Sequence, residues 1–176
     1  RFDKSDGLGR ETLEGVLDIG DYGGDQLNKI ILLCRQKKFD EAFETFKTIY
    51  RSYKINPSAW NQIGTCYLLK GDKRKAMLFY NKAIDLDPKF APPVNNLGVL
   101  HQRDGKDQKA LAAYASAIEL NKFALTPRFN LFQLYLRYSM YSEAESLLLG
   151  LHEKSPNDRN VLASLGYAYL LKGDFI

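Results

Sequence analysis

The sequence repeats with a period of 34 residues, and this period constrains the fold more than any other feature. Small residues recur at this spacing in two series, which are Ala42, Ala76, Ala110 and Ala144, and Gly64, Gly98 and Gly166. A fixed period of this length indicates a solenoid, in which each unit is one supersecondary element and stacked neighbours bury a continuous core.

Each repeat has the pattern of two helices joined by a short turn. In the repeat that begins at Pro57, apolar and small residues at i, i+3, i+4 and i+7 form one face of a first helix, and a matching face follows the turn at Gly71. Asn56 and Thr126 each precede a proline and are expected to cap a helix. We expect helices near residues 25–37, 40–54, 58–70, 73–86, 92–104, 107–120, 127–138, 141–153 and 159–172.

The repeat pattern resembles that of the tetratricopeptide repeat family. The pattern consists of Trp60, Ile63, Gly64, Tyr67, Gly71, Ala76, Tyr80, Ala83 and Pro88. The resemblance implies an all-α, right-handed superhelical solenoid of antiparallel helix pairs, with a concave groove that binds peptides or partner helices. It divides the chain into an acidic, glycine-rich leader (1–22) and about four and a half repeats (23–56, 57–90, 91–124, 125–158 and the half unit 159–176).

Residues 34 apart on the first helices are expected to form ladders along the groove. One ladder is made of Asn28, Gln62, Asn96, Asn130 and Ser164. Carboxamides both donate and accept hydrogen bonds, so such a row can hold the backbone of an extended peptide. It resembles the asparagine ladder in the repeat domain of protein O-GlcNAc transferases, although Gln62 and Ser164 interrupt it. The alternative is that these amides bond helix to helix.

Two further ladders suggest a mixed wall with cationic points and apolar patches. The residues assigned to it are Arg35, Arg103, Arg137, Thr65, Gln133 and Tyr167. Such a wall fits a protein partner with acidic and apolar side chains. Alternatively, the arginines lie near helix C-termini, where a cation is favourable by about 0.3 to 1 kcal/mol without any partner.

Basic residues gather in the turns within the repeats and are expected to form a rim. The rim consists of Lys70, Lys73, Arg74, Lys75, Lys106 and Lys109. An acidic protein or an anionic membrane surface could dock there, although solvated turns are commonly charged without a partner. Interspersed acidic residues and the lack of an aromatic platform argue against nucleic acid.

The leader carries a charge opposite to that of the repeats. Residues 1–25 contain three basic and seven acidic residues, so the net charge of +4 divides into −4 there and +8 in the remainder. A brief amphipathic helix is expected over Glu11 to Asp18. We hypothesise that this acidic, partly apolar leader docks on the basic body of its own chain or a neighbour and mimics the true ligand. The alternative is an unstructured tail.

The sequence shows no motif of catalysis, metal binding or cofactor binding. Cys34 and Cys66 form no CxxC pair and have no histidine at metal-ligand spacing, and His101 and His152 stand in no nucleophile and base arrangement. We expect no cofactor and two free, buried thiols, which favours a cytoplasmic location over a periplasmic or membrane-associated one. No run is long and apolar enough to span a bilayer.

Two features depart from the regular repeat. Phe132 replaces the small residue of the Gly64 series and Leu151 replaces Ala83, so we expect either altered spacing and a pocket near this unit or a compensated core. The turn and helix start at 173–175 leave the final helix without a cover. We expect either that the natural protein continues or that this end seals against another copy.

The sequence therefore favours a non-enzymatic interaction scaffold that binds an extended peptide or partner helix in its groove. One alternative is the substrate-recruiting segment of a larger enzyme such as a glycosyltransferase. The other is a chaperone for secreted or assembling client proteins.

Overall fold

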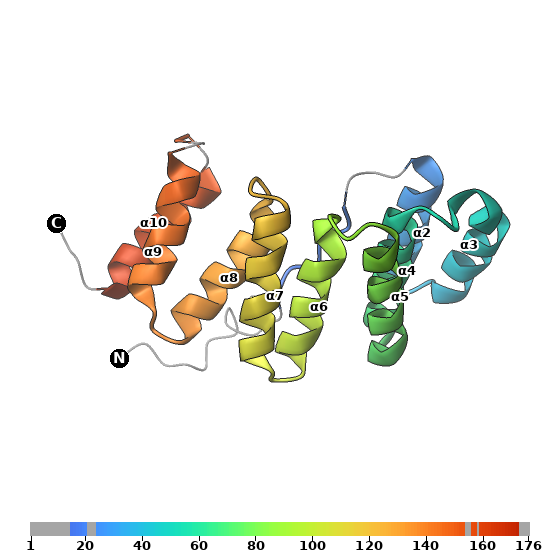
Figure 1. Ribbon diagram of the computed structural model, residues 1–176, viewed down its shortest axis with the longest axis horizontal. Helices are drawn as coiled ribbons and strands as arrows, with labels where there is room; N and C mark the ends of the chain where they lie inside the picture. The colour runs from blue at the N-terminus through green and yellow to red at the C-terminus, as the bar shows by residue number, and fades with distance from the viewer. Residues whose placement is uncertain (1–14, 21–23, 154–155, 158, 173–176) are drawn as a thin grey trace.

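The computed structural model describes residues 15–20, 24–153, 156, 157 and 159–172, and the helices in them stack side by side along one axis (Figure 1). The helices are α2 (Asp25–Arg35), α3 (Phe39–Tyr53), α4 (Pro57–Lys70), α5 (Lys73–Leu86), α6 (Ala91–Arg103), α7 (Asp107–Leu120), α8 (Leu125–Arg137), α9 (Tyr141–His152) and α10 (Arg159–Lys172). The described residues contain no strand. The expected all-α solenoid of antiparallel helix pairs is confirmed. The turn and helix start expected at 173–175 lie outside the described residues.

Local chemistry accounts for most helix starts. The Asn56 side chain accepts hydrogen bonds from the backbone N–H groups of Ser58 (2.9 Å) and Ala59 (3.4 Å), as expected of a cap. The prolines of α6 lie in its first turn, where their missing N–H groups leave no helical bond unmade. The cap expected at Thr126 is wrong, because α8 begins one residue earlier, at Leu125, and Ala124 precedes it without a side-chain cap.

Glycine lets the two helices of a repeat approach closely. A Cβ atom on Gly64 would lie 2.7 Å from the Tyr80 ring, and one on Gly98 would lie 2.6 Å from the Tyr114 ring. Both tyrosines are fully buried. A Cβ atom on Gly166 would meet nothing within 4 Å, so close approach does not explain glycine at that position.

The two bulky residues of the fourth repeat share one core cluster. Phe132 and Leu151 are buried with Ala144, Leu148 and Val161. The cluster joins α8, α9 and α10, and this contact favours a compensated core. In Figure 1, α8 and α9 run obliquely to the upright pair α6 and α7.

Candidate functional site

A segment of the leader, residues 15–20, lies against the first helices of three successive repeats, α4, α6 and α8. Its backbone is not helical, so the helix expected over Glu11 to Asp18 is wrong for residues 15–18, and residues 11–14 lie outside the described residues. The segment runs opposite to the order of the repeats: Val16 bonds to α6 and α8, and Asp18 bonds to α4 and α6. It then leads to Gly24 and α2, drawn in blue in Figure 1.

Two asparagines hold the backbone of Val16. The Val16 N–H donates to Oδ1 of Asn130 at 2.6 Å, and Nδ2 of Asn130 donates to the Val16 carbonyl at 2.9 Å. Nδ2 of Asn95 donates to the same carbonyl at 3.0 Å. Both backbone groups of this residue are therefore satisfied by side-chain amides.

A second pair of asparagines holds Asp18 in the same way. The Asp18 N–H donates to Oδ1 of Asn96 at 2.7 Å, and Nδ2 of Asn96 donates to the Asp18 carbonyl at 2.7 Å. Nδ2 of Asn61 donates to that carbonyl at 3.0 Å. We call Asn61, Asn95, Asn96 and Asn130 the amide clamp.

The amides of the clamp also bond to one another. Nδ2 of Asn96 donates to Oδ1 of Asn61, and Nδ2 of Asn130 donates to Oδ1 of Asn95, both at 2.9 Å. Nδ2 of Asn95 donates to Oδ1 of Asn96 at 3.1 Å. All four residues are fully buried. Bonding from helix to helix and holding a backbone are thus combined in one network of buried amides.

The clamp advances by one repeat for every two residues of the segment. Asn61 and Asn96 hold residue 18, and their counterparts 34 positions later, Asn95 and Asn130, hold residue 16. Two residues of extended chain span about 6.7 Å. The equivalent positions are Leu27 and Gln62 on one side and Phe129 and Ser164 on the other, so the paired asparagines end there.

Alternate side chains of the segment pack against the repeats. Leu17 packs against two clusters of the central repeats, which contain Val99 and Tyr114, and Leu100 and Tyr80, respectively. Ile19 packs against the cluster of the first repeats. Val16, on the other face of the extended chain, is 46% exposed.

Glycine stands at both ends of the described segment, and each has a positive φ. A Cβ atom on Gly15 would lie 2.7 Å from the hydroxyl oxygen of Tyr114, which donates a hydrogen bond to Gln102. A Cβ atom on Gly20 would lie 3.0 Å from the Phe90 ring. A side chain at either position would strain the backbone, because φ is positive, and would lie too close to the neighbouring aromatic residue.

Lysines of the basic rim form ion pairs with acidic residues of neighbouring helices and repeats. Lys73 of α5 forms an ion pair with Asp104, which follows α6, and Lys106 lies 3.7 Å from the same carboxylate. The hydrogen bond from Lys73 lowers the pKa of Asp104. Lys70 of α4 lies 3.7 Å from Asp40 of α3.

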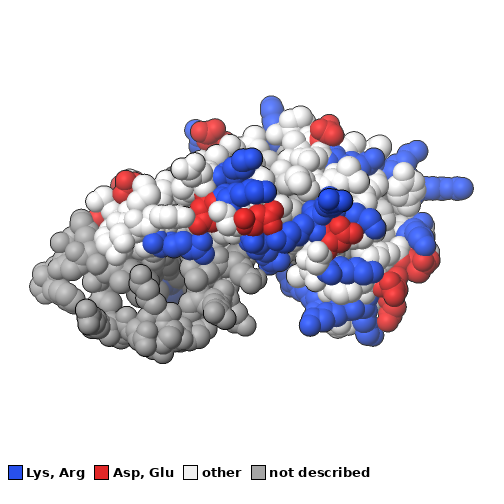
Figure 2. Space-filling view, turned by 90° about the horizontal axis from the view of Figure 1, so that it is seen from below, with Lys and Arg blue, Asp and Glu red and all other residues white. Residues whose placement is uncertain are grey.

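The remaining rim cations lie around the same turns. Lys75 pairs with Asp72 at 3.7 Å, and Arg74 and Lys109 are exposed. Figure 2 shows acidic side chains interspersed among the basic ones on this face. Several of the cations therefore have partners within the chain.

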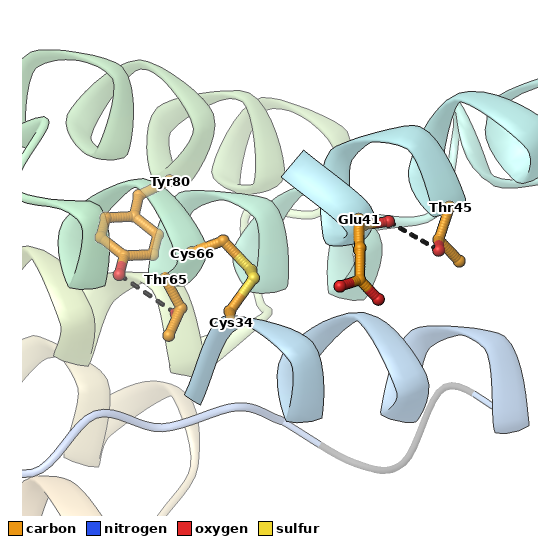
Figure 3. Close-up of a disulfide and its surroundings, with 6 residues drawn as sticks. All are labelled: Cys34, Glu41, Thr45, Thr65, Cys66 and Tyr80. Atoms are coloured by element: carbon orange, nitrogen blue, oxygen red, sulfur yellow. Dashed lines mark hydrogen bonds between the residues drawn. A yellow bond between two sulfur atoms is a disulfide. The ribbon is translucent and has the colours of Figure 1, made fainter. Parts of the chain in front are cut away.

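The other expected wall residues do not contact the segment through any described hydrogen bond. Asn28, Gln62 and Gln133 each have a buried side-chain oxygen without a partner among the described residues. Thr65 lies 3.1 Å from the Tyr80 hydroxyl, inside its own repeat (Figure 3). The side chain of Tyr167 lies outside the described residues.

The three arginines expected in the wall are not equivalent. Arg137 forms an ion pair with Asp107 at 2.9 Å, which joins α8 to α7. Arg103 is half-buried and Arg35 is exposed. No single cationic ladder follows from this arrangement.

Cys34 and Cys66 form a disulfide, so the expectation of two free thiols is wrong (Figure 3). Their Cα atoms are 5.3 Å apart, within the range that a disulfide bridges. The spacing of 32 is two short of the repeat, so the stacking of α2 on α4 brings the two residues together. Disulfides persist mainly in oxidising compartments, and the thiol argument for a cytoplasmic location therefore no longer holds. Ile19 packs on the cluster that contains this disulfide.

The ladder expected from the sequence contains Asn96 and Asn130 but omits Asn61 and Asn95. These two are also 34 residues apart, and they precede Gln62 and Asn96 by one position each. The period of 34 places them at equivalent positions of successive first helices, but it does not show that they contact the same ligand residues as Asn96 and Asn130, because adjacent helical residues point in different directions.

Comparisons with known proteins agree with the repeat architecture. Two family models, both described as tetratricopeptide repeat, match residues 57–90 and 79–112. A search of curated proteins gave no match. Within the described residues, no helix is long and apolar enough to cross a membrane.

Solved structures share the fold at low sequence identity. They include a tetratricopeptide repeat protein from Parabacteroides merdae (TM-score 0.61, 20% identity, 84% of this chain and 58% of that chain). They also include TTC0263 from Thermus thermophilus (TM-score 0.66, 22% identity, 82% of this chain and 81% of that chain). A third is YrrB, described as having an unusual peptide-binding site (TM-score 0.57, 20% identity, 85% of this chain and 77% of that chain). The chain thus spans just over half of the first of these proteins.

Proposed function

The chain is a tetratricopeptide repeat protein, a class of scaffolds for protein–protein interaction, and we propose that its groove binds an extended protein segment by the backbone. The observation that carries the proposal is the amide clamp, which makes six hydrogen bonds to the backbone of residues 16 and 18. Main-chain bonding of this kind gives affinity, and pockets for alternate side chains give specificity. The leader segment occupies the place of such a ligand.

The balance of free energies supports exchange of the leader segment for another ligand. Ordering six residues costs about 9 kcal/mol of backbone entropy at about 1.5 kcal/mol each. Six hydrogen bonds contribute about 6 kcal/mol. Two partly buried apolar side chains, Leu17 and Ile19, contribute about 4 kcal/mol. The docked state is therefore favoured by about 1 kcal/mol, and a competing segment can displace it.

The structural neighbours support the proposal at the level of the fold. YrrB is described as having a peptide-binding site, and that statement concerns YrrB alone. For this chain, the support is the occupied clamp and its buried, mutually bonded amides.

The proposal is tested with peptides that are methylated on alternate backbone nitrogens. The protein is the full chain with Leu17→Asp and Ile19→Asp, called the opened chain, in which the leader loses both apolar anchors. The peptide is Gly-Val-Leu-Asp-Ile-Gly with a terminal fluorophore, and anisotropy measures its binding. N-methylation of its Val or its Asp removes a bond to the clamp and is expected to weaken binding by about tenfold or more.

The matched control is the same peptide methylated on Leu or Ile, whose N–H groups make no described bond to the clamp. We expect these peptides to bind within about threefold of the parent, since the change leaves all six clamp bonds in place. Equal loss at all four positions, or binding that survives Asn96→Ala and Asn130→Ala together, would contradict a backbone clamp. Circular dichroism establishes that the opened chain is folded.

A further inference from the structure

We infer that the groove selects, in a protein partner, an extended segment of the pattern Gly–x–apolar–x–apolar–Gly. This inference rests on the proposed function and adds the identity of the ligand. The leader segment, Gly15 to Gly20, shows what each position of the groove accepts. The partner segment runs in the same direction, opposite to the order of the repeats.

The first position accepts glycine because the groove closes on it. Tyr114 places its hydroxyl oxygen 2.7 Å from where a Cβ atom of residue 15 would lie, and Val99 places a methyl carbon 3.1 Å away. Tyr114 cannot easily withdraw, since it is fully buried and its hydroxyl is bonded to Gln102 at 2.7 Å. The φ of +75° at Gly15 adds a conformational requirement for glycine.

The last position has the same preference for a different reason. Gly20 has a φ of +73°, and a Cβ atom there would lie 3.0 Å from the Phe90 ring. The Asp18 carboxylate accepts a hydrogen bond from the Gly20 N–H at 2.9 Å. A short acceptor such as Asp or Asn two residues before the glycine therefore stabilises the bend by which the chain leaves the groove.

The apolar positions are fixed by the register of the clamp. Because the clamp holds residues 16 and 18 by the backbone, residues 17 and 19 must point to the other face of the extended chain. There Leu17 meets the clusters of the central repeats and Ile19 meets the cluster of the first repeats. A shift by one residue would place the outward-facing side chains of positions 16 and 18 in these apolar sites.

The occupant is a segment of another protein, and the leader acts as its competitor within the chain. Three residues separate Gly20 from Gly24 at the start of α2, so the leader reaches the groove of its own chain and leaves no need for a second copy. Its hold is marginal, and a partner segment with the same pattern meets the same clamp and the same apolar sites. The partner segment therefore binds as it displaces the leader segment from the same site.

The test uses the opened chain and four variants of the peptide Gly-Val-Leu-Asp-Ile-Gly. Replacing its first Gly by Ala, its Leu by Ser or its Ile by Ser is expected to weaken binding by about tenfold or more. The matched control is Val to Ser at the second position, which faces solvent and is expected to change binding by less than about twofold. The unmodified chain should bind the parent peptide about sixfold more weakly than the opened chain, because the leader competes.

The results separate this inference from the proposed function. If peptides bind and depend on Asn96 and Asn130, but Ala at the first position or Ser at the Leu position binds as well as the parent, the pattern is wrong and the backbone clamp stands. If no peptide binds the folded opened chain, both fail. If the unmodified chain forms dimers in light scattering that the Leu17→Asp and Ile19→Asp changes abolish, the occupant is a second copy and the partner assignment is overturned. Should the opened chain not fold, Gly15→Ala replaces it, with Val16→Ala as its control.

Discussion

Replacing Asn96 by Ala should release the leader from the groove. Asn96 makes two of the six bonds that hold the segment, and these contribute about 1 to 3 kcal/mol together. Since the docked state is favoured by only about 1 kcal/mol, a loss of about 2 kcal/mol would reduce the docked fraction from about 85% to about 15%.

The reporter for this change is the backbone amide of Val16, followed by nuclear magnetic resonance. Its N–H bonds to Asn130 and not to Asn96, so its chemical shift reports docking of the segment and not the local substitution. The expected result is a shift toward the value of an unbonded amide. A matched control is Gln62→Met, which alters a buried amide on the same face that makes no described bond to the segment, and it should leave the Val16 shift unchanged.

An unchanged Val16 shift in the Asn96→Ala chain would refute the reasoning. It would mean that packing of Leu17 and Ile19 holds the segment without the clamp. The same spectrum shows whether the repeats remain folded, because the amides of α3 lie two repeats away from Asn96.

Two further predictions concern stability. Gly98→Ala should destabilise the chain by about 1 to 3 kcal/mol in urea unfolding, because the new Cβ atom would lie 2.6 Å from the Tyr114 ring, whereas Gly166→Ala, with nothing within 4 Å, should be neutral or slightly stabilising. Reduction of the Cys34–Cys66 disulfide should lower stability by about 2 to 4 kcal/mol, because it frees a loop in the unfolded chain. A chain with both cysteines changed to Ala should melt at the same temperature with and without reductant, and a wild-type chain indifferent to reductant would contradict the second prediction.

The repeat architecture could be predicted from the sequence because its signals are local and periodic. The helix expected at 58–70 is observed at Pro57–Lys70, since the cap at Asn56 and the proline mark its start chemically. Only two of the four asparagines of the amide clamp could be predicted from the sequence. Asn96 lies on the expected ladder, but the role of Asn61 depends on how far one first helix is rotated against the next, which a spacing of 34 does not specify.

The hypothesis that the leader docks on the body rested on opposite charges, and most acidic residues of the leader lie outside the described residues. The described segment is held by backbone bonds and by two apolar side chains, Leu17 and Ile19. Net charge does not identify such contacts, because an amide reads a backbone regardless of the charge beside it. The disulfide follows no motif spacing, because the stacking of α2 on α4 brings Cys34 and Cys66 together.

Because the ligand advances by two residues per repeat, the groove allows only binding registers that differ by two residues. A segment with apolar residues at every second position could bind in several registers, each displaced by two residues, while every odd displacement would invert its faces. The glycines at the two ends would select one register among these. The asparagines would thus fix the spacing of two ligand residues per repeat. The two end positions, which accept only glycine, would fix the register of the bound segment.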